Sequence, residues 1–231
     1  MTLFAALYSL SAVAAPERTR QNFRVESQPS EYRLPLKIYN LSPANWSRQD
    51  LRFQLSEVNR IFAQCGVQVD QITLDTIETA DLNRKNWDVP DILKMVDTLI
   101  GWREFDQSVV TLFFVQGVVG RLDKLTSTGI AFHPAWTRAP KDVENFADLN
   151  VYMANGTAWI TAQIKNPEYQ SWVGPGYNTT AHEIAHVVLD SGHVEGQEVS
   201  NLLSGHRGRN DKLTETQCLR MRQSRYVKPR F

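Results

Sequence analysis

Residues 177–193 read YNTTAHEIAHVVLDSGH, which has the pattern of one amphipathic helix followed by a bend. Asn178 and Thr180 supply side-chain oxygens that can cap the first helical turn. The apolar residues that follow predict a helix buried in a core. We expect the helix to end near Ser191, with Gly192 in the left-handed conformation that turns the chain back.

The motif HEIAH at residues 182–186 carries the chemistry of this helix. Side chains four residues apart lie on one face of a helix, so His182 and His186 can bind the same ion. Glu183 lies one step round the helix, where it can take a proton from a water molecule on that ion. His193 follows the bend and would complete the three protein ligands of a catalytic zinc site, which leaves a fourth position open.

Other uses of these residues stay open at this point. Thr180 and Glu183 have the spacing of a capping box, in which case the histidines would merely be packed or exposed. His133 has no motif around it, and we interpret it as a hydrogen-bonded polar histidine and not as a metal ligand. Asp190 could instead bind the outer ring nitrogen of a ligand imidazole. Three further residues could replace His193 as the third ligand: Asp190, Glu195 and His206.

The motif resembles the signature of the metzincin metallopeptidases, His-Glu-x-x-His-x-x-Gly-x-x-His, which is followed by a tight turn with Met under the metal. Leu189 stands where the family has Gly, and the third histidine arrives one residue late. Residues 200–204, SNLLS, correspond to the turn, with Leu203 in place of Met. The resemblance implies one catalytic zinc ion, with Glu183 as general base and with these ligands: His182, His186 and His193.

The rest of the chain predicts alternating strands and helices. Strands are expected at residues 33–39, 67–74, 108–119, 128–134, 150–153 and 157–162, and further helices at residues 47–64, 90–102 and 214–226. The resemblance implies an α+β domain of the α/β/α zincin-like kind. Its twisted mixed sheet would have an antiparallel edge strand, an active-site helix and a C-terminal helix.

The edge strand pairs with the substrate backbone in metzincin-like enzymes, and this role would fall on residues near Ile130 to Phe132. An ordinary edge strand without a ligand is the alternative. Phenol groups stabilise the oxyanion in related enzymes, which makes Tyr177 and Tyr226 the candidates for that role in this sequence.

Residues 1–15, MTLFAALYSLSAVAA, are apolar and end in small residues, which predicts a secretory signal peptide, although no basic residue precedes the apolar run. A buried N-terminal helix is the alternative. Residues 16–231 would then form a single catalytic domain in a secreted or periplasmic protein. Cys65 and Cys218 could form a disulfide in such a compartment, and two free buried thiols are the other interpretation.

The charge and composition exclude some classes of partner. The chain has 25 basic and 25 acidic residues, so no net field attracts nucleic acid. A content of 42% hydrophobic and 22% charged residues is typical of a water-soluble globular domain and argues against stable membrane insertion. The partner that we expect is a peptide or protein substrate.

The sequence therefore predicts a zinc-dependent endopeptidase in which Glu183 activates a water molecule on the zinc ion to attack a peptide carbonyl. The alternative is a zinc-binding but catalytically inactive protein of zincin fold that acts as a binding module. A globular protein without metal is the third interpretation.

Overall fold

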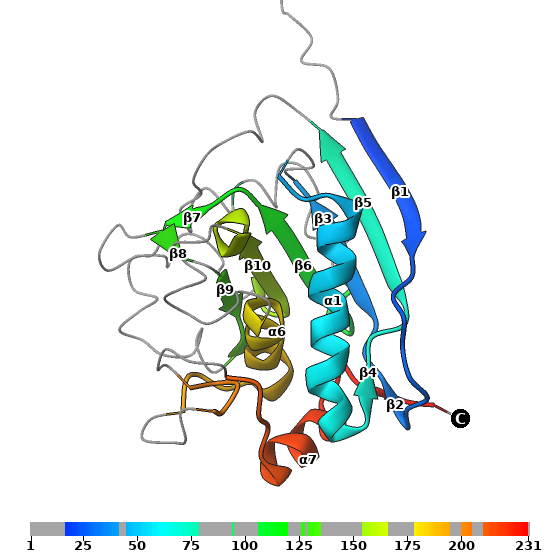
Figure 1. The fold of residues 1–231 in the computed structure, drawn as a ribbon, viewed down its shortest axis with the longest axis vertical. Coiled ribbons are helices and arrows are strands. Elements are labelled where there is room, and N and C mark those ends of the chain that lie inside the picture. The colour runs from blue at the N-terminus through cyan, green and yellow to red at the C-terminus, as the bar shows by residue number, and fades with distance from the viewer. Residues whose placement is uncertain are drawn as a thin grey trace, which may run out of the picture.

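A six-stranded mixed sheet runs through the centre of the molecule (Figure 1). The computed structural model describes residues 17–41, 45–78, 94, 106–119, 126–127, 129–134, 154–165, 178–194, 200–204 and 210–230. Along the sheet the strands are β1 (Glu17–Phe23), β5 (Ile72–Glu78), β3 (Leu36–Asn40), β6 (Val110–Val115), β10 (Thr157–Thr161) and β9 (Gly129–Phe132). The inner strands β5, β3, β6 and β10 are parallel, and the two outer strands are antiparallel to their neighbours.

Smaller elements surround this sheet. One small sheet joins β11 (Lys228–Pro229), β2 (Tyr32–Arg33) and β4 (Val67–Gln68), and another joins β7 (Val118–Val119) to β8 (Thr126–Ser127). The helices are α1 (Arg48–Phe62), η1 (Ala63–Cys65), η7 (Ala162–Lys165), α6 (Asn178–Leu189) and α7 (Glu215–Gln223). None of the helices in the described part of the chain has the length and hydropathy that a membrane span requires.

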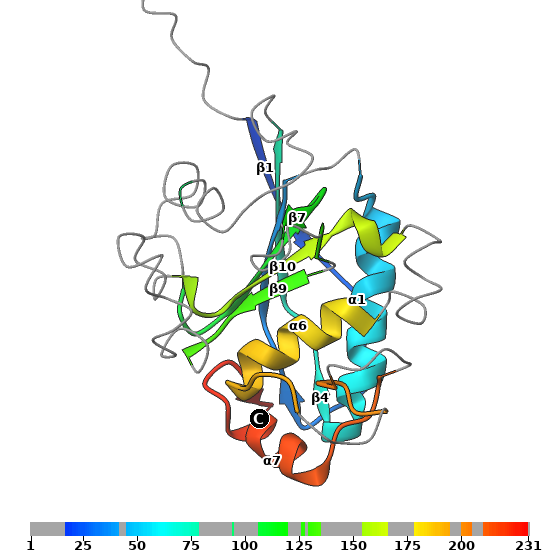
Figure 2. The same ribbon diagram turned by 90° about the vertical axis from the view of Figure 1, so that its left-hand side faces the viewer.

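Helices α1 and α6 cover one face of the sheet, and α7 lies beyond their ends (Figures 1 and 2). Helix α1 begins at a capping box in which Ser47 and Asp50 bond to each other's backbone N–H groups. Its apolar stripe faces the sheet, and the Thr180 hydroxyl of α6 donates to Gln54 of α1 at 2.7 Å in the buried contact between the helices. Helix α6 is thereby held in place by two neighbours, the sheet that it covers and helix α1 beside it.

The opposite face of the sheet carries a different set of side chains. Tyr39, Phe113 and Trp159 come from three adjacent strands and stack in sequence, with ring centroids 5.2 Å and 4.1 Å apart. Asp75 lies on the same face with its carboxylate buried. Three cationic side chains bond to that carboxylate: Arg18, Arg20 and Lys37. Burial alone would raise the pKa of Asp75, but these hydrogen bonds outweigh it and lower the pKa to about 2.

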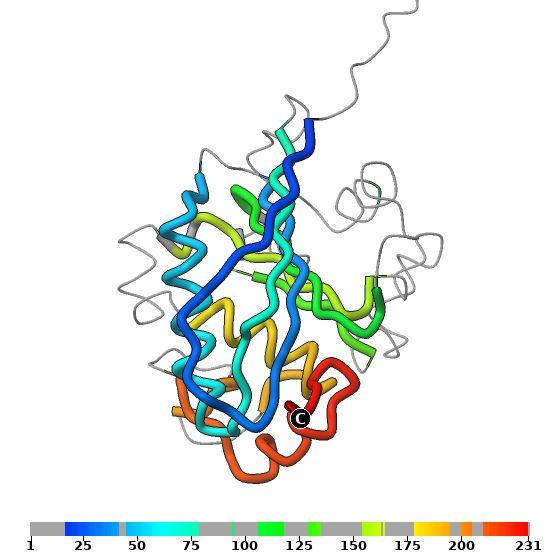
Figure 3. Tube along the Cα trace, turned by 90° about the vertical axis from the view of Figure 1, so that its right-hand side faces the viewer, coloured from blue at the N-terminus to red at the C-terminus, as the bar shows by residue number. Residues whose placement is uncertain are grey.

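A disulfide joins Cys65, at the end of η1, to Cys218 in α7, so the predicted bridge is confirmed. The Cα atoms of the two cysteines are 4.7 Å apart across a sequence separation of 153 residues. Figure 3 shows the C-terminal segment beside the end of α1, with β1 running along β5 at the edge of the sheet that faces the viewer. The bridge fixes α7 to the helical layer.

The predicted fold class is confirmed, including the mixed sheet, the antiparallel edge strand β9 and the C-terminal helix. The strand predicted at residues 67–74 divides into β4 and β5, which belong to different sheets. Strand β1 was not predicted. The expected helix at residues 90–102, apart from residue 94, the strand at 150–153 and the signal segment 1–15 lie outside the described residues.

Candidate active site

Three histidines converge at the end of α6. Helix α6 presents His182 and His186 on one face, with their Nε2 atoms 2.9 Å apart, and the Nε2 atom of His193 lies 3.1 Å from that of His182. Every candidate ligand atom of the group lies within 4.8 Å of the others. Nitrogens about 3.3 Å apart would surround a tetrahedral zinc ion with bonds of about 2.0–2.1 Å. The donor set therefore fits one zinc ion.

The bend that brings His193 to the site is made by Asp190. Helix α6 ends at Leu189, and Asp190 follows with φ of 47°, the left-handed region that Asp tolerates better than most residues. The prediction that Gly192 adopts this conformation is wrong, because the described glycines with positive φ are Gly66 and Gly156.

The outer ring nitrogens of both helix histidines face backbone carbonyls. The Nδ1 atom of His182 lies 2.5 Å from the Leu202 oxygen, and the Nδ1 atom of His186 lies 2.6 Å from the Ser191 oxygen. A carbonyl only accepts, so Nδ1 carries the proton and the Nε2 lone pair points into the group. Asp190, one candidate for this outer role, faces His133 instead, with Nδ1 and Oδ1 3.4 Å apart.

Residues 200–204 form a turn behind His182. The amide oxygen of Asn201 accepts a hydrogen bond from the Leu203 N–H at 2.9 Å. Leu202 and Leu203 are both fully buried in the hydrophobic core. The Leu203 carbonyl accepts from the Val194 N–H at 3.0 Å, so the turn also contacts the segment beside His193. Residues 200–204 therefore form a turn whose Leu side chains are buried, while its correspondence to the metzincin turn stays a prediction.

Glu183 is buried beside the start of the edge strand β9. A Cβ atom on Gly129 would lie 2.7 Å from both Cγ and Oε1 of Glu183, so only glycine leaves room for this side chain. Burial raises the pKa of Glu183 to about 8, and a nearby cation would oppose this effect. The capping-box alternative is wrong, because Thr180 lies inside α6 and its hydroxyl donates to Gln54.

The three histidines are suited to binding a cation in their neutral form. Burial lowers the pKa of His182 to about 4, and burial together with His182 lowers that of His186 to about 3. Burial also lowers the pKa of His193. Neutral imidazoles are the form that coordinates metals, so protons compete only weakly for this site at neutral pH.

His133 lies closer to the site than the sequence suggested. It follows β9 directly, is 5% exposed, and stacks parallel to His186 with ring centroids 5.8 Å apart. The prediction of a hydrogen-bonded polar histidine agrees with its contact to Asp190, and among the described residues His133 is not part of the group that could hold a metal ion. Its position immediately after the edge strand was the signal that could have placed it here.

Other candidates are placed elsewhere or not described. Glu195, His206 and Tyr177 lie outside the described residues. Tyr226 is buried, and its hydroxyl accepts a hydrogen bond from Arg225 and lies 2.8 Å from where a Cβ atom on Gly156 would be. Tyr226 therefore fills the space beside the turn before β10.

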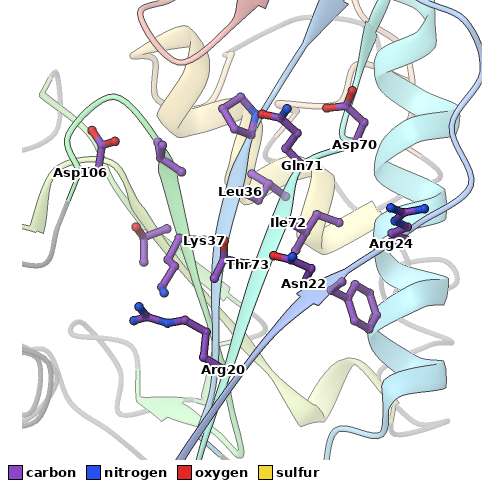
Figure 4. A pocket seen from close by; sticks show the side chains of 14 residues that line it. Arg20, Asn22, Arg24, Leu36, Lys37, Asp70, Gln71, Ile72, Thr73 and Asp106 are labelled. Carbon is purple, nitrogen blue, oxygen red and sulfur yellow. The ribbon is translucent and has the colours of Figure 1, made fainter.

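A cavity of about 680 Å³, whose lining Figure 4 shows, includes none of the three histidines among its lining residues. Its lining comes from β1, β3, β5 and β6 and their adjoining loops, without a residue of α6. Arg20 and Lys37, two of its basic side chains, are already bonded to Asp75. The charges of this cavity are thus largely balanced internally, and the cluster on α6 is the better candidate for chemistry.

A comparison with solved structures finds a similar fold. No protein-family model and no curated protein matches the chain. The solved structure of metalloproteinase-II from Bacteroides fragilis is similar, with a TM-score of 0.50 and 13% sequence identity. The similarity covers 88% of this chain and 57% of that chain. The protein therefore shares its overall fold with this metalloproteinase and spans little more than half the length of this neighbour.

Proposed function

We propose that the protein is a zinc-dependent endopeptidase of the metzincin-like type. The observation that carries the proposal is the convergence of three histidine Nε2 atoms on α6 and the bend after it, the same helix that carries the buried Glu183. The fold shared with the Bacteroides fragilis metalloproteinase supports it. The zinc ligands would be His182, His186 and His193.

The protein's own side chains have separate parts in this reaction. A bound zinc ion supplies Lewis acidity, which lowers the pKa of water and polarises a carbonyl group. Glu183 takes the proton from the attacking water and passes it to the leaving amine; burial raises its pKa in the metal-free protein, and a cation held by the histidines would oppose that shift and favour the charged carboxylate that accepts the proton. The backbone carbonyls of Leu202 and Ser191 hold the two imidazoles of α6 in orientation.

The substrate that suits this site is an extended peptide. Strand β9 is the last in the six-stranded sheet as described and starts beside Glu183. An extended chain can pair with the backbone of an edge strand, which would align its carbonyl groups along the site. Residues 16–231 would form the catalytic domain, exported by the signal at residues 1–15, and the disulfide between Cys65 and Cys218 is compatible with an oxidising compartment.

The test compares the wild-type protein with Glu183→Ala and His186→Ala. We expect the wild type to retain one zinc ion per chain after dialysis and to cleave an unfolded protein substrate. Glu183→Ala should retain the zinc ion and lose cleavage, because Glu183 moves a proton and does not bind the metal, whereas His186→Ala should lose both. A Glu183→Ala variant that cleaves like the wild type would refute the mechanism. Zinc binding without cleavage in the wild type would instead favour a binding module.

A further inference from the structure

Helix α7 contacts two segments that adjoin the histidine group, the turn behind His182 and the end of α6. Gln217 bonds to Asn201 in the turn behind His182, and Arg220 bonds to the last carbonyl of α6. We propose that α7 positions the metal ligands, with Gln217 and Arg220 as positioning residues. This inference rests on the proposed zinc site, and it assigns a role to a helix that carries no ligand.

The first contact is a reciprocal pair of amides. The Asn201 Nδ2 atom donates to Gln217 at 2.9 Å, and the Gln217 Nε2 atom donates back to Asn201 Oδ1 at 3.2 Å. The same Oδ1 atom accepts the Leu203 N–H at 2.9 Å, so the pair fixes the peptide groups of the turn. Leu202 lies between Asn201 and Leu203 in this turn, and its carbonyl faces Nδ1 of His182. The ring orientation of His182 therefore depends on a turn that Gln217 holds.

The second contact acts on the bend towards His193. The Arg220 guanidinium donates to the Leu189 carbonyl at 2.5 Å. The final carbonyls of a helix lack partners within the helix, and a cation is favourable at this end. Leu189 is the last residue of α6, and Asp190 with its positive φ follows at once. Arg220 thus fixes the point from which the chain turns to bring His193 to the other ligands.

Helix α7 is itself anchored to the helical layer. Cys218 is bridged to Cys65, and Arg222 donates to the Cys65 carbonyl at 2.9 Å. These bonds tie α7 to the end of η1 and make it a fixed support. Arg222 also provides a matched control for Arg220, because each arginine bonds to the carbonyl of a helix-terminal residue, and only the partner of Arg220 leads into the site.

The first experiment measures Zn²⁺ affinity of the full chain by competition with a chromophoric chelator. Arg220→Ala should weaken zinc binding about three- to tenfold, below the 10- to 100-fold typical of groups that touch a ligand directly. It should also shift the visible absorption of the Co²⁺-substituted protein, because the ligand geometry changes. Arg222→Ala should bind Zn²⁺ and Co²⁺ like the wild type, although both variants lose a hydrogen bond of the same kind.

A second pair of variants separates positioning from helix capping. Thr214 and Gln217 form the capping box of α7, so Thr214→Ala and Gln217→Ala both remove it. Only Gln217→Ala also removes the pair with Asn201, and only this variant should weaken zinc binding and change the cobalt spectrum. Gln217→Glu keeps an acceptor oxygen for Asn201 and should recover part of the affinity.

The outcomes distinguish this inference from the proposed function. A wild type that binds no zinc would overturn the proposed function itself. A wild type that binds zinc, with Arg220→Ala and Gln217→Ala binding equally tightly, would overturn the positioning role alone. Equal weakening in all the alanine variants would overturn it too, since it would indicate general loosening of α7. Should Arg220→Ala fail to fold, the comparison of Gln217→Ala with Thr214→Ala decides.

Discussion

The substitution Gly129→Ala should disable the proposed general base while leaving the metal ligands in place. The added Cβ atom would meet Glu183 Cγ and Oε1 at 2.7 Å, and Cδ at 2.9 Å. Ordinary van der Waals contact begins at 3.4 Å, so either the buried carboxylate or strand β9 must move by about 0.7 Å. Neither can move freely, because Glu183 is enclosed and β9 is paired with β10.

The size of the effect follows from this displacement. A misplacement of about 1 Å in a reacting group can lower a rate about 100-fold. For a shift of about 0.7 Å we expect kcat/KM to fall about 30- to 100-fold, which corresponds to about 2 to 3 kcal/mol of transition-state stabilisation. Overpacking should also lower the free energy of unfolding by about 1 to 3 kcal/mol.

The assay is cleavage of a fluorogenic peptide, with zinc content measured on the same samples. Gly192→Ala is the matched control, because it makes the same change beside His193, where, apart from the chain neighbours of Gly192, no atom of the described residues lies within 4 Å of the new Cβ atom. We expect it to keep both zinc and activity. The reasoning is refuted if Gly129→Ala cleaves at the wild-type rate, or if it loses zinc along with activity, since the clash concerns Glu183 and not the ligands.

Three further predictions concern stability. The Asp75 carboxylate, whose pKa is lowered from 3.8 to about 2, should stabilise the folded state by about 2 kcal/mol above pH 3.8, and this contribution should be lost as the pH falls through 2. Urea unfolding of the wild type and of Asp75→Asn across this pH range measures it. A difference in unfolding free energy between the two proteins that does not change with pH would contradict the prediction. Replacing Cys65 and Cys218 together by Ser should lower the unfolding free energy by about 5 kcal/mol in the same assay, and an unchanged value would contradict the chain-entropy argument. The metal-free protein should lose stability as the pH falls from 6.5 through about 3, because unfolding releases His182 and His186 from burial and each takes up a proton, and together they outweigh the opposite contribution of Glu183, whose raised pKa lets the folded state hold one proton. A stability that is flat across this range would contradict the burial of the two rings.

The position of the candidate site could be predicted because its geometry is local. Two histidines four residues apart share a helix face whatever the rest of the fold does. The residue that makes the bend was harder to predict, since Gly192 and Asp190 both tolerate positive φ. The choice between them depends on the residue at which α6 ends. The carbonyl at that end bonds to Arg220, which lies 31 residues downstream.

Long-range partners left no pattern in the sequence. The carbonyl that faces His182 belongs to Leu202, and a backbone oxygen is present at every residue, so residue type gives no indication of it. Strand β1 reads ERTRQNF and buries only Phe23, so it lacks the alternation of apolar residues by which strands are predicted. Its pairing with β5 depends instead on backbone hydrogen bonds and on the arginines that reach Asp75.

The bridge between Cys65 and Cys218 has a consequence for biosynthesis. The covalent ring that it closes contains β5, β6, β9, β10 and α6, and its second thiol follows all of them in the sequence. During translation the ring cannot close until Cys218 has left the ribosome. Oxidation therefore follows the synthesis of these five elements, and any truncated product that stops between residues 65 and 218 keeps one unpaired thiol and can be recognised by alkylation.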